Sequence, residues 1–185
     1  MTKSNYLRRL PLPKRRHRAV CASLVPAVAL LCTAAARGQE CAWTLRNAAG
    51  GPTPRSGHAM VYDSGRARIV LFGGINATTL QGDTWEWDGL VWTQRATTGP
   101  SPRALGPGMA YDSARRRVVL FGGYDGQYKG DTWEWDGAAW TQRATTGPSA
   151  RNAHAMAYDA ARGRVVLFGS GGGGADTWEW DGTTW

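Results

Sequence analysis

The sequence predicts an all-β protein built from three four-stranded antiparallel sheets. The first observation is a repeat, because the letters DTWEWDG occur at 83–89, 131–137 and 176–182. The second is the spacing, since Trp85 and Trp133 lie 48 residues apart (133 minus 85). The third is the pattern inside each unit, where short apolar, β-branched runs are separated by turn residues. Periods of roughly 20 to 50 residues are typical of solenoids and propellers.

Each unit is expected to form one sheet. The units are residues 51–98, 99–146 and 147–185, and the third is the shortest. In the first unit, HAMVYD predicts the first strand and RIVLFGG the second. The second run is apolar and rich in β-branched residues, which suits a strand buried on both faces. TWEW and LVWTQ predict the third and fourth strands.

The turn between the third and fourth strands is predicted at Asp88-Gly89, because Asp-Gly suits the type I′ turn of a two-residue hairpin. This register places Trp85 opposite Trp92. Alternate residues of a strand share a face, so the tryptophans would form one apolar surface and Glu86 would point to the other side. A four-stranded sheet cannot bury such a surface alone, so neighbouring sheets are expected to stack on it.

With this pattern the chain resembles a run of kelch repeats, the four-stranded blades of a β-propeller. The residues that carry the resemblance are Gly73-Gly74, Gly122-Gly123, Trp87, Trp135, Trp180, Trp92, Trp140 and Trp185. The third unit has Gly169-Ser170 in place of a glycine pair, which predicts modest strain if that position needs a positive φ. The resemblance implies a secreted bacterial protein of the galactose oxidase and kelch propeller superfamily.

Three blades make an incomplete ring, because propellers have roughly four to eight. The sequence therefore predicts a piece of a longer propeller, and association of two three-blade halves is the alternative. Open sheet faces also predict self-association. CAWTLR matches the end of a unit, so residues 39–50 are predicted to form an N-terminal strand that could close the ring.

All ten tryptophans fall in the repeat register, including Trp43, which lies 49 residues before Trp92 (92 minus 43). Side chains that recur in every blade are expected to lie in the core between sheets. An aromatic platform for carbohydrate is the alternative.

Residues 1–38 are predicted to be a signal peptide, because a basic stretch is followed by an apolar one and then by small residues. This predicts a secreted, periplasmic or cell-envelope protein without membrane attachment once the leader is cleaved. An uncleaved anchor is the alternative, since residues 19–36 form an apolar run of 18 residues. Cys41 is the one cysteine of three that follows the leader, and it would be either a free thiol or paired with another chain.

The positive charge belongs to the leader. It holds eight of the 22 basic residues and none of the 14 acidic ones, so the remainder has 14 of each sign. The net charge of +8 therefore gives no reason to expect a nucleic-acid partner.

No catalytic residue, metal site or cofactor is predicted. The resemblance to galactose oxidase implies a copper site with a tyrosine cross-linked to a cysteine, but no cysteine follows Cys41. His58 and His154 occupy the same position in two units and are expected to be structural. Glu86 and its two counterparts are too regular for an asymmetric catalytic pair. The alternative is the propeller part of a secreted carbohydrate-active or galactose-oxidase-like enzyme whose catalytic residues lie outside this chain.

The units differ most between the second and third strands, at 75–82, 124–130 and 170–175. These loops are expected to project at one mouth of the propeller and to bind a protein or glycan partner, since loops freed from packing can carry function. The alternative is that they are spacers. The candidate binding residues are Asn76, Gln81, Tyr124, Asp125, Gln127, Tyr128 and Lys129.

Three arginines recur just before the first strand of each unit. They are Arg55, Arg103 and Arg151. A ring of guanidinium groups near the channel would suit an anionic ligand, so they are also candidate binding residues. The alternative is a clamp between blades, in which each arginine pairs with the aspartate that opens the repeated heptapeptide.

Overall fold

The computed structural model describes residues 43–46, 49–171 and 174–185. The predicted signal peptide (1–38) and Cys41 lie outside these residues. The chain divides into two units after Trp43, and the unit Thr44–Trp185 holds all the strands described below. The described residues contain strands and turns but no helix, so the prediction of an all-β fold is confirmed. In particular, none of these residues forms a helix long and apolar enough to cross a membrane.

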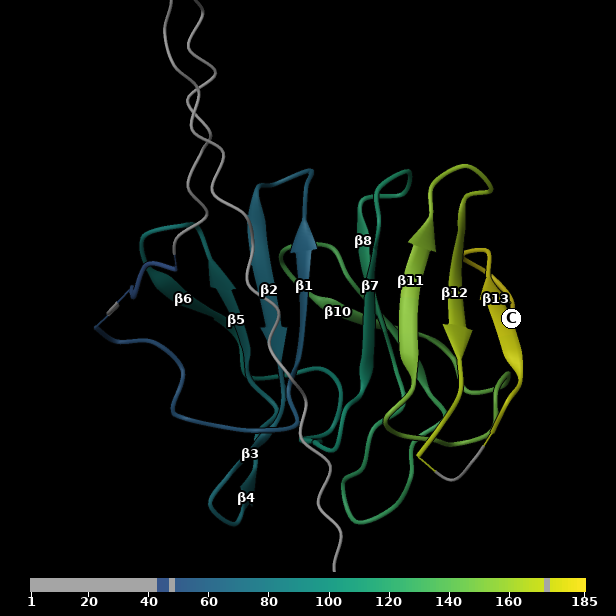
Figure 1. Cartoon of the computed structure of the whole chain (residues 1–185), viewed down its shortest axis with the longest axis horizontal. Helices are drawn as coiled ribbons and strands as arrows, with labels where there is room; N and C mark the ends of the chain where they lie inside the picture. Colours follow the sequence, from purple (N-terminus) through teal and green to yellow (C-terminus); the bar gives the residue numbers. More distant parts are fainter. Residues whose placement is uncertain (1–42, 47–48, 172–173) are drawn as a thin grey trace, which may run out of the picture. The chain divides into compact units, whose positions relative to one another are not determined.

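Three antiparallel sheets, here called blades 1 to 3, correspond to the three repeats (Figure 1). Blade 1 consists of β1 (Ala59–Asp63), β2 (Arg68–Phe72), β5 (Thr84–Trp87) and β6 (Trp92–Ala96). Blade 2 consists of β7 (Gly108–Asp112), β8 (Arg117–Phe121), β9 (Thr132–Trp135) and β10 (Trp140–Ala144). Blade 3 consists of β11 (Ala155–Asp159), β12 (Arg164–Phe168) and β13 (Thr177–Trp180). The strands of each blade are joined in chain order, as in propeller blades.

The first strands of the three blades, β1, β7 and β11, lie side by side (Figure 1). The second strand is buried on both faces in blade 2, as its unbroken apolar run predicts: Val118, Val119, Leu120 and Phe121 of β8 are all fully buried. A sheet with neighbours on both faces needs such a strand, because side chains on either face then lie in a core.

The core lies between neighbouring blades, and the predicted stacking of tryptophan faces is confirmed. Between blades 1 and 2 it comprises Ala59, Val70, Phe72, Met109, Tyr111, Val118, Leu120, Trp135 and Trp140. In β9, Trp135 faces blade 1, whereas Glu134 faces blade 3 and accepts a hydrogen bond from it. Because alternate residues of a strand face opposite sides, the tryptophans of a blade face the preceding blade and its glutamate faces the following blade.

The outer hairpin differs from its predicted register. Trp87, and not Trp85, pairs with Trp92. The cause is the side chain of Asp88, which accepts hydrogen bonds of 2.9 and 2.8 Å from the last two amide groups of the loop 88–91. This turn closes a longer loop than the predicted Asp-Gly pair, and it recurs in blades 2 and 3. A side chain that caps nearby amides competes with the two-residue turn.

The glycine pairs that end the second strands are left-handed, with φ of 72° and 99° in blade 1 and 70° and 100° in blade 2. The amide of Gly123 in blade 2 donates a 2.9 Å hydrogen bond to the carbonyl of Arg151 in blade 3. In blade 3, Gly169 has φ 81°, but Ser170 is not in the left-handed region. The strain predicted for Ser170 is therefore not found, because its backbone adopts another conformation.

Two further expectations concern the edges of the repeat. The predicted loop 75–82 contains a small hairpin, in which β3 (Ile75–Asn76) pairs with β4 (Thr79–Leu80) (Figure 1). Of the predicted N-terminal strand (39–50), residues 43–46 are exposed and do not lie in a strand, and residues 39–42 and 47–48 lie outside the described part of the chain.

Candidate functional site

The three repeated arginines each form a two-pronged ion pair with an aspartate. Arg103 donates to Asp131 at 2.7 and 3.0 Å and to the carbonyl of Gly122 at 3.1 Å, and its side chain is 1% exposed. Arg55 and Arg151 repeat these contacts in blades 1 and 3. The predicted pairing of each arginine with this aspartate is confirmed, but each pair lies within one blade, so its placement as a clamp between blades is wrong. The reason is that the arginine before the first strand reaches across its own sheet to the third.

These contacts set the charge of the aspartates. Burial alone raises the pKa of Asp131, but hydrogen bonds from Arg103 and Trp133 outweigh it and hold that pKa below its usual range. In blade 3, hydrogen bonds from Arg151 and Trp178 lower the pKa of Asp176. The carboxylates therefore stay ionised near neutral pH and neutralise the guanidinium groups. A role for these arginines in binding an anionic ligand stays a prediction.

The backbone at Arg103 and at Arg151 joins the blade of each arginine to the loop of the preceding blade. The amide of Arg103 donates to the carbonyl of Gln81 at 3.0 Å, and its carbonyl accepts from Gly74 at 2.8 Å. The amide of Arg151 donates in the same way to Lys129 at 2.9 Å. The loops between the second and third strands are thus tied to the chain that enters the next blade, and they lie at one end of the sheets (Figure 1).

In blade 1 the candidate residues contact each other. The side-chain amide of Gln81 donates to the side-chain oxygen of Asn76 at 3.0 Å, and the side-chain amide of Asn76 donates to the hydroxyl of Thr53 at 3.3 Å. These bonds support the β3–β4 hairpin and occupy part of the hydrogen-bonding capacity of both amides.

In blade 2 the candidate residues form a more elaborate loop. The rings of Tyr124 and Tyr128 meet edge to face, with centroids 5.3 Å apart. Lys129 lies 2.8 Å from the carboxylate of Asp125, which also accepts a 2.8 Å hydrogen bond from Ser101. The amide of Gln127 caps the same carboxylate at 3.3 Å. Asp125 thus organises the loop, while Tyr128 remains 58% exposed.

An open groove borders this loop. It has a volume of about 650 Å³ and is lined by Tyr128, Lys129, Gly130, Asp131 and residues 145–150. A smaller cavity of about 100 Å³ adjoins it, lined by Tyr128, Ala150, Arg151, Asn152 and Ser170. Tyr128 belongs to both. Sequence reasoning missed the connection 145–150 and Asn152, because the connection is nearly identical between units and gave no sign of function.

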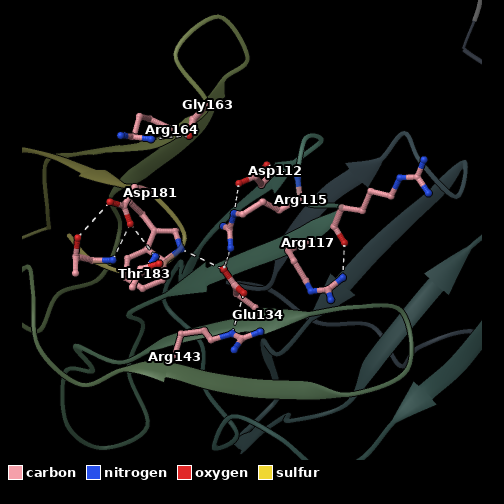
Figure 2. Close-up of polar contacts among 12 residues, drawn as sticks. Asp112, Arg115, Arg117, Glu134, Arg143, Gly163, Arg164, Asp181 and Thr183 are labelled. Carbon is pink, nitrogen blue, oxygen red and sulfur yellow. Dashed lines mark hydrogen bonds and ion pairs between the residues drawn. The ribbon is translucent and has the colours of Figure 1, made fainter.

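The repeated glutamates prove to be structural in their contacts. Figure 2 shows Glu134 between Arg115 and Arg143, which lie 2.5 and 2.9 Å from its two carboxylate oxygens. Arg115 also pairs with Asp112 at 2.7 Å. Glu134 in addition accepts the indole N–H of Trp180 in blade 3 at 3.1 Å. One oxygen of this buried carboxylate, Oε1, therefore accepts from Arg115 and Trp180, and the other, Oε2, accepts from Arg143.

The two matched histidines lie apart from any metal-binding cluster in the described residues, where no three His, Cys, Asp or Glu side chains gather. The ring of His154 packs edge to face on Phe121, with centroids 5.6 Å apart. Burial, together with the positive charge of Arg151, lowers the pKa of His154 to about 4. Burial and Arg55 lower the pKa of His58 in the same direction. Both imidazoles are neutral at physiological pH.

Comparison with known proteins assigns no family to the chain. No family model matches the sequence, and no curated protein matches it. Among solved structures, the chain is similar to a fucose lectin from Kordia zhangzhouensis in complex with methyl-fucoside, with 18% identity and a TM-score of 0.45. The match covers 70% of this chain and 95% of the lectin chain. A similarity this distant assigns neither a family nor a ligand.

Proposed function

We propose that this protein is an exported, kelch-type propeller module without catalytic activity, which binds a glycan in the groove beside Tyr128. The observation that carries the proposal is the exposed ring of Tyr128 at the border of both cavities. A sugar offers apolar C–H faces and many hydroxyls, and an aromatic ring next to polar groups suits both.

The polar groups are present around that ring. Lys129 and Asp125 supply a charged pair, and Asn152 lines the smaller cavity with an amide that can both donate and accept. Hydrogen bonds from Ser101 and Gln127 hold Asp125 in place, so the loop is ordered before a ligand arrives. A preorganised site loses less entropy on binding.

The rest of the proposal rests on the sequence and on side-chain contacts. Export follows from the leader, residues 1–38, which would place the mature protein outside the cytoplasm or in the envelope. The absence of catalysis is supported by the engagement of Glu134 and Asp131 in ion pairs with arginines, which leaves these carboxylates poorly suited to proton transfer.

A glycan array followed by calorimetry with a soluble oligosaccharide tests the function. Tyr128→Ala should weaken binding at least about tenfold, which corresponds to a loss of ~1.4 kcal/mol. Gln94→Ala is the control, because Gln94 is exposed on β6 of blade 1 and does not line the groove. Unchanged affinity in Tyr128→Ala, or an array without any bound glycan, would refute the proposal. Capture of a protein ligand by the same loop would favour the protein-binding alternative.

A further inference from the structure

The same pair of side-chain hydrogen bonds joins neighbouring blades at both junctions. The indole nitrogen of Trp135 in blade 2 donates to the carboxylate of Glu86 in blade 1 at 3.1 Å. The indole nitrogen of Trp140 donates to the hydroxyl of Thr84 at 2.8 Å. One blade therefore presents two indole donors, and the preceding blade presents a carboxylate and a hydroxyl as acceptors.

The junction between blades 2 and 3 has the same contacts at the same distances. Trp180 donates to Glu134 at 3.1 Å, and Trp185 donates to Thr132 at 2.8 Å. Since two junctions built from different residues agree this closely, the donor face and the acceptor face are complementary surfaces that the repeat specifies.

Two further contacts complete each junction. The guanidinium of Arg66 lies over the turn of the next blade, where a Cβ on Gly137 would be 2.7 Å from its Nη1. Arg115 lies in the same way over Gly182, at 2.6 Å from such a Cβ. Between blades 1 and 2, the hydroxyl of Tyr111 also hydrogen-bonds to the carboxylate of Asp63. Burial together with this hydrogen bond raises the pKa of the tyrosine. The turn glycine, which has φ 101° in both blades, leaves room for the arginine of the preceding blade.

Blade 3 presents the same acceptor side chains, and no described residue covers them. They are Thr177, Glu179, Arg162 and Asp159, the counterparts of those at the two junctions. The side chain of Glu134 is 1% exposed, but that of Glu179 is 40% exposed, although it retains its 2.5 Å ion pair with Arg162. These side chains are therefore arranged as at the two occupied junctions, although the second arginine there, Arg95 or Arg143, has no counterpart on the strands of blade 3.

Blade 1 presents the complete donor face at the other end of the repeat. Its members are Trp87, Trp92, Gly89 and Tyr62. Trp87 and Trp92 pack at 5.5 Å and 43°, close to the 5.5 Å and 42° of the occupied pair Trp135 and Trp140. No atom of another residue lies within 4 Å of a Cβ built on Gly89, so the place that an arginine fills at both junctions is open here.

We propose that the acceptor face of blade 3 binds the donor face of blade 1 in a second copy of this chain, so that two copies form a closed ring. In the ring, Trp87 of one copy donates to Glu179 of the other, Trp92 donates to Thr177, and Arg162 lies over Gly89. Two copies with three large sheets each give six blades, within the roughly four to eight of known propellers.

A second copy fits for three reasons. The two faces match residue by residue, and their counterparts already bind each other twice within the chain. Binding covers the indole rings of blade 1 and the exposed Phe168 of blade 3, and exposed apolar faces of this kind favour association. The contact is head to tail, and such contacts make a closed ring whenever the rotation between subunits closes.

The experiment is a mass measurement of the full chain by sedimentation equilibrium over a range of concentrations. The expected result is a dimer. Glu179→Arg removes the acceptor for the indole and places two cations together, so it should raise the dimer dissociation constant at least about 100-fold. Tyr62→Glu places a carboxylate beside Asp159 of the other copy and should do the same. Gln142→Arg, on the exposed outer strand β10, is the control and should leave the dimer intact.

Mixing the two variants distinguishes this contact from any other. The Tyr62→Glu chain keeps an intact blade 3 face and the Glu179→Arg chain an intact blade 1 face, so an equimolar mixture should form a dimer through one junction. Circular dichroism of each variant checks that it is folded. A folded wild-type monomer, longer oligomers instead of dimers, a dimer that survives both variants, or a mixture that stays monomeric would each overturn the proposal.

Discussion

The indole nitrogen of Trp135 donates a 3.1 Å hydrogen bond to the carboxylate of Glu86, a residue 49 positions earlier in the chain. Both residues come from copies of the same heptapeptide, so one short phrase supplies both sides of a contact between blades. The alternation of faces along a strand explains this, because neighbouring residues point to opposite neighbours. The repeated heptapeptide thus supplies the side chains that join consecutive blades.

The buried glutamate should contribute more to stability than its exposed counterpart. Glu134→Gln breaks ion pairs to Arg115 and Arg143 inside the junction and should lower the free energy of unfolding by about 3 kcal/mol. Glu179→Gln breaks an exposed pair and should cost less than about 1 kcal/mol. Both are compared by urea unfolding in a Tyr62→Glu background, which keeps the blade 3 face open. Equal losses would contradict the assignment of the two faces.

A tryptophan in the junction and a tyrosine in the loop should separate stability from binding. Trp135 is 1% exposed, and Trp135→Ala should cost roughly 3 to 5 kcal/mol, the range for large aromatic side chains in a core. Tyr128→Ala should change the free energy of unfolding by less than roughly 0.5 kcal/mol. Guanidinium unfolding measures both. A large loss for Tyr128→Ala would show that the loop is part of the core.

The second residue after the second strand should tolerate serine in blade 3, where it is Ser170, but not in blade 2, where it is Gly123. Gly123 has φ 100°, and its amide donates to Arg151 of the next blade. Gly123→Ser should therefore cost about 1 to 2 kcal/mol, the cost of a left-handed conformation for a residue with a Cβ. Ser170→Gly is the matched control and should change stability by less than about 1 kcal/mol. Thermal unfolding that ranks the two in the opposite order would refute this account.

Most of the fold was predictable because the repeat carries redundant information. The three copies showed where each unit begins and ends. The run RVVLF predicted the buried strand, since short apolar runs rich in β-branched residues are typical of buried strands. The register of the outer hairpin was not predictable from Asp88-Gly89, because side-chain capping by the aspartate competes with the two-residue turn. That competition depends on geometry that composition does not reveal.

The candidate site was predictable only in part. The variable loop 124–130 was found by comparing the units, and it does hold Tyr128 at the edge of the groove. The other wall, residues 145–150, is nearly invariant between units, so comparison gave no reason to select it. The role of the glutamates between blades was not predicted, because it depends on which face of the strand each one occupies.

The buried histidine of blade 3 should make stability depend on pH. His154 has a pKa of about 4 when folded, below its usual 6.5, because of burial and Arg151. Between these two pH values the unfolded chain binds more protons, so stability falls as the pH is lowered through this window and is fully present above it. The fall should be on the order of 3 kcal/mol.

His154→Leu should remove this part of the pH dependence, which is measured by urea unfolding at several pH values between 7 and about 4. The aspartates with lowered pKa values, such as Asp131, lose their stabilising ionisation only at lower pH, so their contribution does not overlap with that of the histidine. An unchanged slope in the variant would show that His154 is not the group responsible.

Hydrogen exchange of the indole N–H groups, followed by NMR, tests the central claim that each blade donates its indoles to the preceding one. In the Tyr62→Glu monomer, Trp135 and Trp180 should be strongly protected, because each donates across a closed junction. Trp87, with the same place in blade 1, should exchange at least about tenfold faster, since protection follows the free energy of opening. Equal protection of Trp87 and Trp135 in the monomer would contradict the account.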